Sequence, residues 1–137
     1  MGSIMIQRHF VAHAPPPPRG VKYAHATQAG GWLYVTGQLP NDPETPESPF
    51  PEGIEAQTQQ TFRNLIVIIQ AAGYSLRDTV FARLFLTDFA RDFDDLNKVY
   101  FRYFADDGAV PSRTTVGVAK LGRDALVEID LVLYKAP

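Results

Sequence analysis

The order of hydrophobic and polar residues along this chain switches between two repeat lengths, which mark helices and strands. Hydrophobic side chains recur at helical spacing over residues 54–72, before Gly73, and again over about residues 91–104. Period-two alternation, typical of strands, covers residues 4–11, 23–29, 32–39, 79–88 and two runs within 110–134. The Gly30-Gly31 pair predicts a tight hairpin turn between two of these strands.

The two faces of the predicted strands differ in polarity, and this difference predicts the architecture. One face of the last strand is wholly apolar and consists of Ala125, Val127, Ile129, Leu131 and Leu133. Its other face is mixed and consists of Leu126, Glu128, Asp130, Val132 and Tyr134. The strand within 79–88 likewise has an apolar face of Val80, Ala82, Leu84 and Leu86. Two helices can cover only one side of a sheet of about five or six strands, so we expect an α+β sandwich whose other side packs against further copies of the chain.

Two proline-rich segments interrupt this pattern. Ala14–Gly20 contains four consecutive prolines, which fix φ and remove backbone donors, so it is predicted to be an extended surface connection. Leu39–Gly53 contains five more prolines and is predicted to be an exposed loop without regular structure.

Composition limits the classes of protein that remain. The chain has 137 residues, 45% of them hydrophobic, and we expect one domain over residues 1–137, with Met1-Gly2-Ser3 interpreted as a remnant of cloning. A net charge of −2 with scattered basic residues argues against nucleic-acid binding. The absence of cysteine excludes disulfides and thiolate chemistry. No apolar run reaches the roughly 18 to 20 residues of a membrane helix, so we expect a soluble cytoplasmic protein that does not bind membranes.

Two charged residues near the C-terminal end are the first candidates for chemistry. Glu128 lies on the mixed face of the last strand, where an unpaired buried carboxylate is costly. Arg113, at the start of the preceding strand, is its nearest expected partner, across a hairpin or a subunit boundary. The two form either a structural ion pair or part of a functional site, and spacing alone does not decide between these roles. A neighbouring arginine predicts a lowered pKa for Glu128.

Other polar residues give weaker signals. Asn97 falls in the apolar stripe of the second predicted helix, so its amide needs hydrogen bonds, either to a backbone loop or within a site. The three histidines form no metal-binding motif, and Ser112 lies in no nucleophile elbow. Neither a metal site nor serine hydrolase chemistry is therefore expected.

Several segments, in this order and at this spacing, resemble the RidA (YjgF/YER057c/UK114) family of enamine and imine deaminases. The resemblance covers nearly the whole chain and rests on the succession of motifs rather than on a single one. The motifs are YAHA, YVTGQL, AQTQQTFRNLIVIIQAAGYSLRDTV, DFDDLNKVYFRYF, VPSRTTVGVAKL and ALVEIDLVL.

The resemblance implies a chorismate-mutase-like α+β fold, with one mixed sheet and two helices on one face, assembled as a homotrimer. It implies ligand clefts between neighbouring subunits, in which small enamines and 2-imino acids such as 2-aminoacrylate are hydrolysed to 2-keto acids and ammonia. It implies no metal or organic cofactor. By their positions in the matching motifs, the implied catalytic residues are Arg113, which holds the substrate carboxylate, and Glu128, which orients water. The implied substrate-binding residues are Tyr23, Gly37, Asn97 and Thr115.

Other functions remain open on the sequence alone. The cleft can bind a small carboxylate without turnover, as a regulatory or chaperone-like module. Endoribonuclease activity and a pathway-specific deaminase of the aminomuconate type are two further alternatives. The chain departs from the family pattern at Lys22, Ala24 and Thr115, which surround the expected cleft and bear on the identity of the substrate.

Overall fold

A computed structural model describes residues 5–137 and confirms the predicted succession of strands and helices. The expected cloning remnant Met1-Gly2-Ser3 lies outside the described residues. The strands are β1 (Ile6–His9), β2 (Ala26–Ala29), β3 (Trp32–Gln38), β4 (Thr79–Leu86), β5 (Ser112–Gly117) and β6 (Val127–Tyr134). The α-helices are α1 (Ile54–Ala71) and α2 (Phe89–Tyr103).

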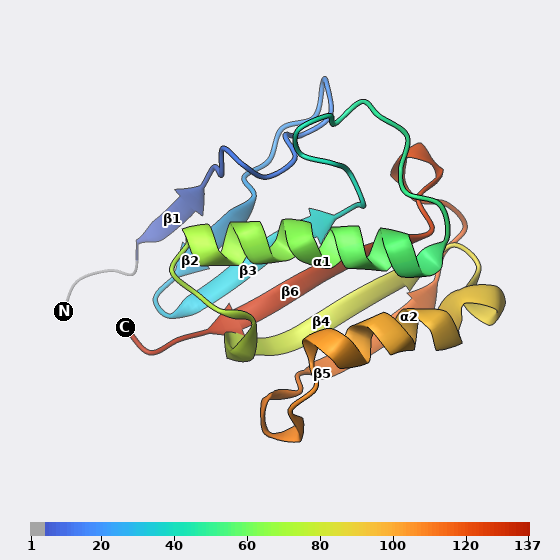
Figure 1. Cartoon of the computed structure of the whole chain (residues 1–137). Coiled ribbons are helices and arrows are strands. Elements are labelled where there is room, and N and C mark those ends of the chain that lie inside the picture. Colours follow the sequence, from blue (N-terminus) through green and yellow to red (C-terminus); the bar gives the residue numbers. More distant parts are fainter. Residues whose placement is uncertain (1–4) are drawn as a thin grey trace.

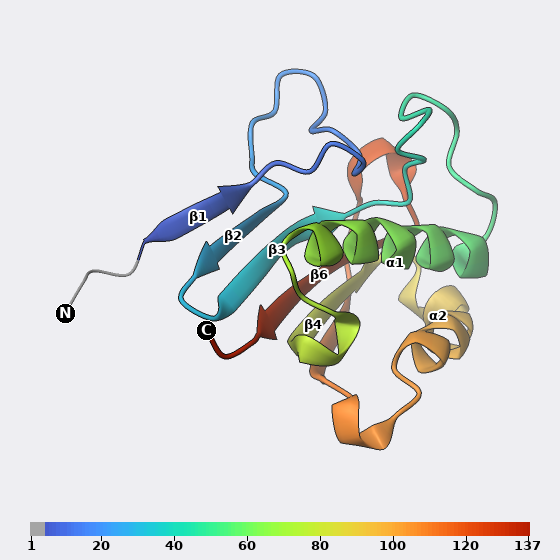
Figure 2. The ribbon, with the colours of Figure 1, turned by 60° about the vertical axis from the view of Figure 1, so that its left-hand side comes forward.

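The strands of residues 5–137 form one mixed six-stranded sheet in the order β1-β2-β3-β6-β4-β5. Neighbouring strands are antiparallel except β4 and β5, which are parallel. Both helices lie on the same face of the sheet, with α1 across β3 and β6 and α2 beside β4 and β5 (Figures 1 and 2). This confirms the predicted α+β arrangement of one mixed sheet with two helices on one face.

The last two strands are not neighbours, so a hairpin does not bring Arg113 to Glu128 as the sequence analysis considered. β4 lies between them, which puts β5 at one edge of the sheet and β6 near its centre. Parallel strands need a crossover connection, and α2 provides it between β4 and β5. The hydrophobic pattern identifies each strand but does not specify its neighbour in the sheet.

The hydrophobic core fills the space between the helices and the sheet. Phe62 of α1 is fully buried and stacks on Tyr103 of α2, with ring centroids 4.4 Å apart. The rings of Tyr100 and Phe104 meet Phe62 edge-on and join the two helices further. From the sheet, the apolar face of the last strand is buried as predicted, with Ala125, Val127, Ile129, Leu131 and Leu133 all at 1% exposure or less.

The predicted apolar face of β4 is wrong at its first position. Val80 is 41% exposed, while its neighbour Thr79 is buried. The pairing of β4 with β6 shifts register between Thr79 and Phe81, where β4 contains one extra residue. Such a bulge reverses the alternation of side chains on one side of it. Ala82, Leu84 and Leu86 beyond the bulge are buried as predicted.

Glycine and proline positions delimit the elements largely as predicted. Gly30 has a φ of 58° in the turn between β2 and β3, and Gly73 has a φ of 86° just after α1. In the described chain, Leu39–Gly53 is free of strands and helices before Gly53 gives way to α1, as expected. Ala14–Gly20 is also irregular, but Ala14 and Pro15 are buried, so this segment is not purely a surface connection.

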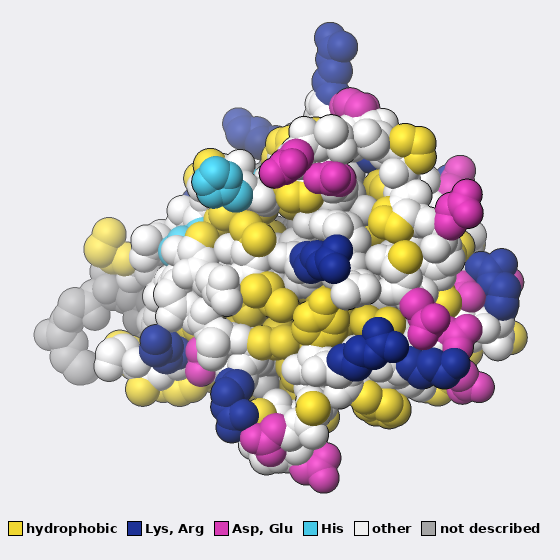
Figure 3. All heavy atoms as spheres, in the orientation of Figure 1, with side chains coloured by type: hydrophobic (Ala, Val, Ile, Leu, Met, Phe, Trp, Pro, Cys, Tyr) yellow, Lys and Arg dark blue, Asp and Glu magenta, His cyan; other side chains and the backbone are white. Residues whose placement is uncertain are grey.

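No helix or strand of residues 5–137 covers the sheet face opposite the helices (Figures 1 and 2). Val132 pairs with Tyr34 on one side and Phe81 on the other, which makes an apolar row across three strands. Next to this row, Arg83 donates two hydrogen bonds of 2.9 Å to the carboxylate of Asp130. The covered side is shown in Figure 3, where a band of hydrophobic side chains crosses the middle and charged side chains crowd the right-hand edge. No helix among residues 5–137 is long and apolar enough to span a membrane.

Candidate functional site

The sequence-predicted site residues lie in two separate groups, the first of which is centred on Arg113 of β5. Its Nε donates to Thr115 Oγ1 at 2.7 Å, and its Nη2 donates to Asn97 Oδ1 at 2.6 Å. Its guanidinium also lies over the ring of Tyr100, 4.5 Å from the centroid, and 5.6 Å from that of Phe93. Asn97, Tyr100 and Phe93 all come from α2, so one helix and one strand fix the position of this arginine.

These contacts prepare Arg113 to bind an anion. Two hydrogen bonds and an aromatic face hold the planar guanidinium in one orientation, which reduces the entropy lost when a ligand binds. Its Nη1 donates to no described residue, so this side of the group is left for a ligand. Burial lowers the pKa of Arg113 from its usual value, but an arginine remains positively charged at neutral pH.

Tyr100 is a member of this group that the sequence pattern assigned only to the core. Its side chain is 3% exposed, and its hydroxyl has no hydrogen-bond partner among residues 5–137. Burial raises the pKa of this hydroxyl, and the charge of Arg113 opposes the rise. Its apolar spacing on the helix, rather than any polar signal, placed Tyr100 in the core, so proximity to Arg113 could not be foreseen.

The second group is centred on Glu128 of β6 and includes Tyr23 and Gly37. These residues line one cavity of about 440 Å³, together with Thr36, Gln38 and parts of both proline-rich segments. Gly37 lies against the carboxylate, because a Cβ atom at this position would be only 2.5 Å from Glu128 Oε2. A side chain at residue 37 would therefore displace the carboxylate, which explains the glycine in physical terms.

The pKa of Glu128 is raised, which is the opposite of the sequence-based expectation. Burial is the largest cause, and the negative charge of Asp130 adds to it. Arg83, rather than Arg113, is the cation that opposes the rise. The pKa of Tyr23, which lines the same cavity, is also raised, first by burial and then by the negative charge of Glu128.

Arg113 and Glu128 do not meet within one chain. Arg113 contacts side chains of α2, on the helix-covered side of the sheet edge. Glu128 lies between Val127 and Ile129, which are buried under the helices, so its own side chain projects to the opposite face. No hydrogen bond or ion pair joins the two side chains in the part of the chain that the structure describes. The alternative in which the two residues meet across a hairpin is therefore wrong, and a meeting across a subunit boundary stays a prediction.

Buried polar side chains hold the walls of the cavity beside Glu128. Asn64 of α1 donates from Nδ2 to the carbonyl oxygens of Leu39 and Asn41, at 3.0 and 2.8 Å. His25 accepts from the backbone N–H of Val11 at Nδ1 and contacts the Pro15 carbonyl through Nε2 at 2.7 Å, which assigns its proton to Nε2. Asn64 was not predicted as a site residue, because its only local signal is an amide on the buried face of an amphipathic helix.

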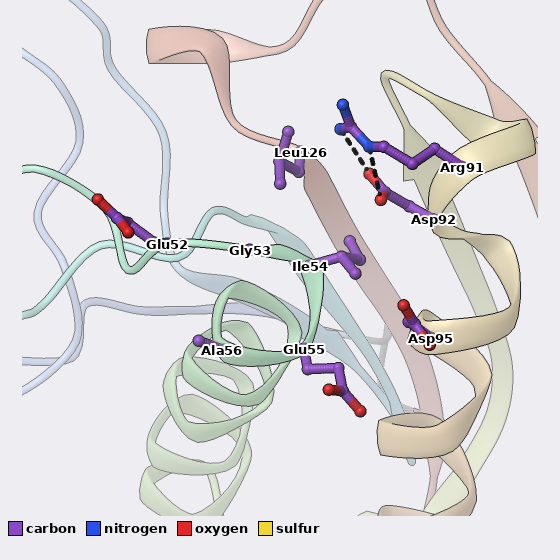
Figure 4. A pocket seen from close by; sticks show the side chains of 9 residues that line it. All are labelled: Glu52, Gly53, Ile54, Glu55, Ala56, Arg91, Asp92, Asp95 and Leu126. Atoms are coloured by element: carbon purple, nitrogen blue, oxygen red, sulfur yellow. Dashed lines mark hydrogen bonds and ion pairs between the residues drawn. The ribbon is translucent and has the colours of Figure 1, made fainter.

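A larger hollow of about 700 Å³ lies between the N-terminal ends of α1 and α2, and it contains no predicted site residue. Figure 4 shows its acidic lining, with Glu52 and Glu55 on one side and Asp92 and Asp95 on the other. Asp92 is buried, and its carboxylate already accepts two hydrogen bonds of 2.9 Å from Arg91. Because its buried charge is neutralised, this hollow offers no group in need of a ligand, and the smaller cavity beside Glu128 is the better candidate.

Comparison with known proteins finds relatives over nearly the whole chain. The family model for endoribonuclease L-PSP matches residues 13–135. A RutC family protein from Pyrococcus horikoshii is 39% identical over 92% of this chain and 95% of its own length. Among solved structures, RidA from an Antarctic Psychrobacter is 38% identical, with a TM-score of 0.84 over 94% of this chain and 99% of that one. E. coli TdcF with bound serine is 29% identical, with a TM-score of 0.86 over 95% of this chain and 99% of that one.

We predict that Asn64→Leu loosens the loop that follows β3. The substitution keeps the size of the side chain but leaves two carbonyl groups without their donor, which should lower the free energy of unfolding by about 1–3 kcal/mol. Chemical denaturation measures this loss, and limited proteolysis should cut within Leu39–Gly53 faster than in the wild type. Gln59→Ala, on a half-exposed position of the same helix, is the control. Wild-type stability and cutting rate in Asn64→Leu would contradict the role assigned to this residue.

Proposed function

The chain belongs to the endoribonuclease L-PSP family, which includes RidA and RutC proteins, and on this premise we propose that it is a cofactor-independent deaminase. Its proposed substrates are reactive enamines and 2-imino acids such as 2-aminoacrylate, and its products are 2-keto acids and ammonia. The observation that carries the proposal is the pair of prepared groups described above. One is Arg113, whose guanidinium is held by two hydrogen bonds, and the other is the half-buried carboxylate of Glu128, which lines a cavity.

We further propose that the two groups combine between subunits of a homotrimer. Within one chain Arg113 lies at the β5 edge and Glu128 on the opposite face, so neither group alone makes a complete site. The uncovered sheet face, with its row of Tyr34, Val132 and Phe81, supports burial against other copies of the chain. In such an assembly Arg113 and Thr115 of one subunit would face Glu128 of the next, with one cleft at each of the three interfaces.

Arg113 would bind the carboxylate that every 2-imino acid carries. Its guanidinium can donate two parallel charge-assisted hydrogen bonds to a carboxylate, a geometry that lysine cannot reproduce. Asn97 and Thr115 would act by holding the guanidinium, since both already bond to it. This contact fixes the imine carbon relative to the second subunit and removes much of the entropic cost of the reaction.

Glu128 would orient the attacking water and receive its proton. The enamine first tautomerises to the imine, and water then adds to the imine carbon to give a carbinolamine. Collapse of that intermediate breaks the C–N bond, releases ammonia and leaves the 2-keto acid, so the reaction consumes one water and no oxidant. The raised pKa of Glu128 makes it a stronger base than an ordinary glutamate, which suits proton transfer. Tyr23 and the backbone around Gly37 would position the substrate from the same side.

A binding module without turnover is the second candidate function. The solved structure of TdcF, a relative of this chain, contains bound serine, so a small amino acid can occupy a member of this fold. Such a module would use Arg113 in the same way but would not need the raised pKa of Glu128. An endoribonuclease function has less support, because the net charge of −2 provides no field that attracts a polyanion.

The proposal predicts that the wild-type protein removes 2-aminoacrylate faster than a chemical trap does. The enamine is generated with serine dehydratase and trapped with semicarbazide, and the protein should divert it to pyruvate and ammonia. Arg113→Ala and Arg113→Lys should lower kcat/KM by roughly 100-fold and 10-fold, because they remove the bidentate contact. Arg102→Ala, an exposed arginine of α2, is the matched control. Carboxylate binding without any turnover by the wild type would favour the binding module instead.

The raised pKa of Glu128 predicts an acid limb in the pH profile of kcat/KM. Water orientation requires the carboxylate, which is present above the pKa and lost as the pH falls through it. Activity should therefore decline over a range above 4.5, the ordinary value for this side chain. In Glu128→Gln the remaining activity should be low and independent of pH, once the spontaneous hydrolysis measured without protein is subtracted. A wild-type profile that stays flat down to 4.5 would contradict the proposed role of Glu128.

A further inference from the structure

We infer that the cavity beside Glu128 is a side-chain pocket that selects 2-imino acids with bulky apolar side chains, branched aliphatic or aromatic. The inference rests on the proposed deaminase function and adds the class of substrate. Its basis is the size, the lining and the rigidity of the cavity that Glu128 lines. The substrate side chain takes no part in the hydrolysis, which consumes water and releases ammonia whatever its size.

The cavity is much larger than the smallest imines require. Its volume of about 440 Å³ falls within the range of roughly 300–1,000 Å³ of pockets that bind small organic ligands. The side chain of 2-iminopropanoate, by contrast, is a single methyl group. Filling the remaining space with ordered water gains nothing, whereas an apolar side chain displaces that water into bulk solvent.

A large part of the lining is apolar. Besides Glu128 and Tyr23, the cavity is lined by the apolar side chains of Pro15, Pro16, Pro18 and Leu39, and by the polar residues Thr36, Gln38, Asn41 and Arg123. Proline rings are rigid and carry no side-chain donor, so they provide a contact surface without an entropic cost of ordering. This proline and leucine part of the wall suits a flat or branched hydrocarbon group.

Among the described residues that line the cavity, Arg123 is the one cation, and both of its terminal nitrogens already donate hydrogen bonds. Its Nη1 donates to the Pro46 carbonyl at 2.7 Å and its Nη2 to the Ser48 carbonyl at 2.8 Å. The guanidinium also lies over the Phe50 ring, 4.4 Å from its centroid. An acidic substrate side chain would have to break these bonds to pair with Arg123, which favours an apolar ligand over an anionic one.

The pocket is held open by contacts from three separate parts of the chain. His25 fixes the Pro15 carbonyl, Asn64 fixes those of Leu39 and Asn41, and Arg123 fixes the loop at Pro46 and Ser48. Each of these side chains bonds to backbone carbonyl groups of a loop, so each holds the path of a segment. A wall that is ordered before the ligand arrives does not require binding energy to form.

The test compares the protein on two imines that differ only in the side chain. 2-Iminopropanoate is supplied by serine dehydratase, and the imine of leucine or phenylalanine by an amino acid oxidase with catalase. Both are followed by competition with semicarbazide. Because a methylene group in an apolar pocket changes kcat/KM by roughly tenfold or more, we expect the bulky imine to exceed the small one by at least about tenfold. A preference for the small imine in the wild-type protein would overturn the inference.

Pocket-filling variants locate the selectivity in this cavity. Leu39→Trp should lower the ratio of the two kcat/KM values at least about tenfold, because the indole occupies the space of the substrate side chain. Gly122→Leu should act similarly from the facing wall, where a Cβ atom would lie 3.2 Å from Leu39 Cδ1. Met5→Trp, at a position 83% exposed, is the control for an added indole and should leave the ratio unchanged. An unchanged ratio in both folded pocket variants would overturn the inference.

Binding of the product keto acids separates this inference from the proposed function. Calorimetry should show phenylpyruvate binding at least about tenfold more tightly than pyruvate, with the difference lost in Leu39→Trp. Tight phenylpyruvate binding without turnover of either imine would disprove the deaminase and retain the pocket as the site of a bulky keto acid. Turnover of both imines, together with equal affinities for the two keto acids, would disprove the side-chain pocket and retain the deaminase.

Discussion

The one-sided covering of the sheet is the constraint on which the rest of this structure depends. α1 and α2 remove one face of the strands from water, and the aromatic cluster around Phe62 joins them into a single layer. The opposite face combines an apolar row with the ion pair of Arg83 and Asp130, and no further element among residues 5–137 covers it. The same division separates the candidate catalytic groups, because Arg113 contacts α2 whereas Glu128 projects from the uncovered face.

The pattern of hydrophobic residues predicted the helices and strands well. A helix or strand that buries one face must place apolar residues at the repeat of its own secondary structure. The apolar face of β6 and the stripe of α1 follow directly from this effect, and the family motifs pointed to Arg113, Glu128 and the residues around them. The order of strands could not be predicted in this way, since the parallel pairing of β4 with β5 depends on the path of the chain through α2. The bulge at Val80 and the raised pKa of Glu128 likewise arise from neighbours that are distant in sequence.

Buried polar side chains connect the core of this protein to its candidate chemistry. Asn97 appeared in the sequence as an amide within an apolar stripe, and in the structure it accepts a hydrogen bond from Arg113. The Nδ2 group of Asn64 and both ring nitrogens of His25 make their hydrogen bonds to the backbone of the loops that form the cavity. A buried polar side chain needs hydrogen-bond partners, and in each case a partner belongs to the candidate site, either Arg113 or the loops that line the cavity. The positions of the site are thus fixed by the same requirement that stabilises the fold.

The central claim is that one site contains Arg113 from one subunit and Glu128 from the next, and complementation between inactive variants tests it most directly. Arg113→Ala and Glu128→Gln are mixed in equal amounts, dissociated, allowed to reassemble and assayed for imine hydrolysis. In a cyclic trimer with random mixing, about a quarter of the clefts should receive both intact groups, so roughly a quarter of wild-type activity should return. A mixture that stays as inactive as either variant, although its subunits have exchanged, would contradict the shared site.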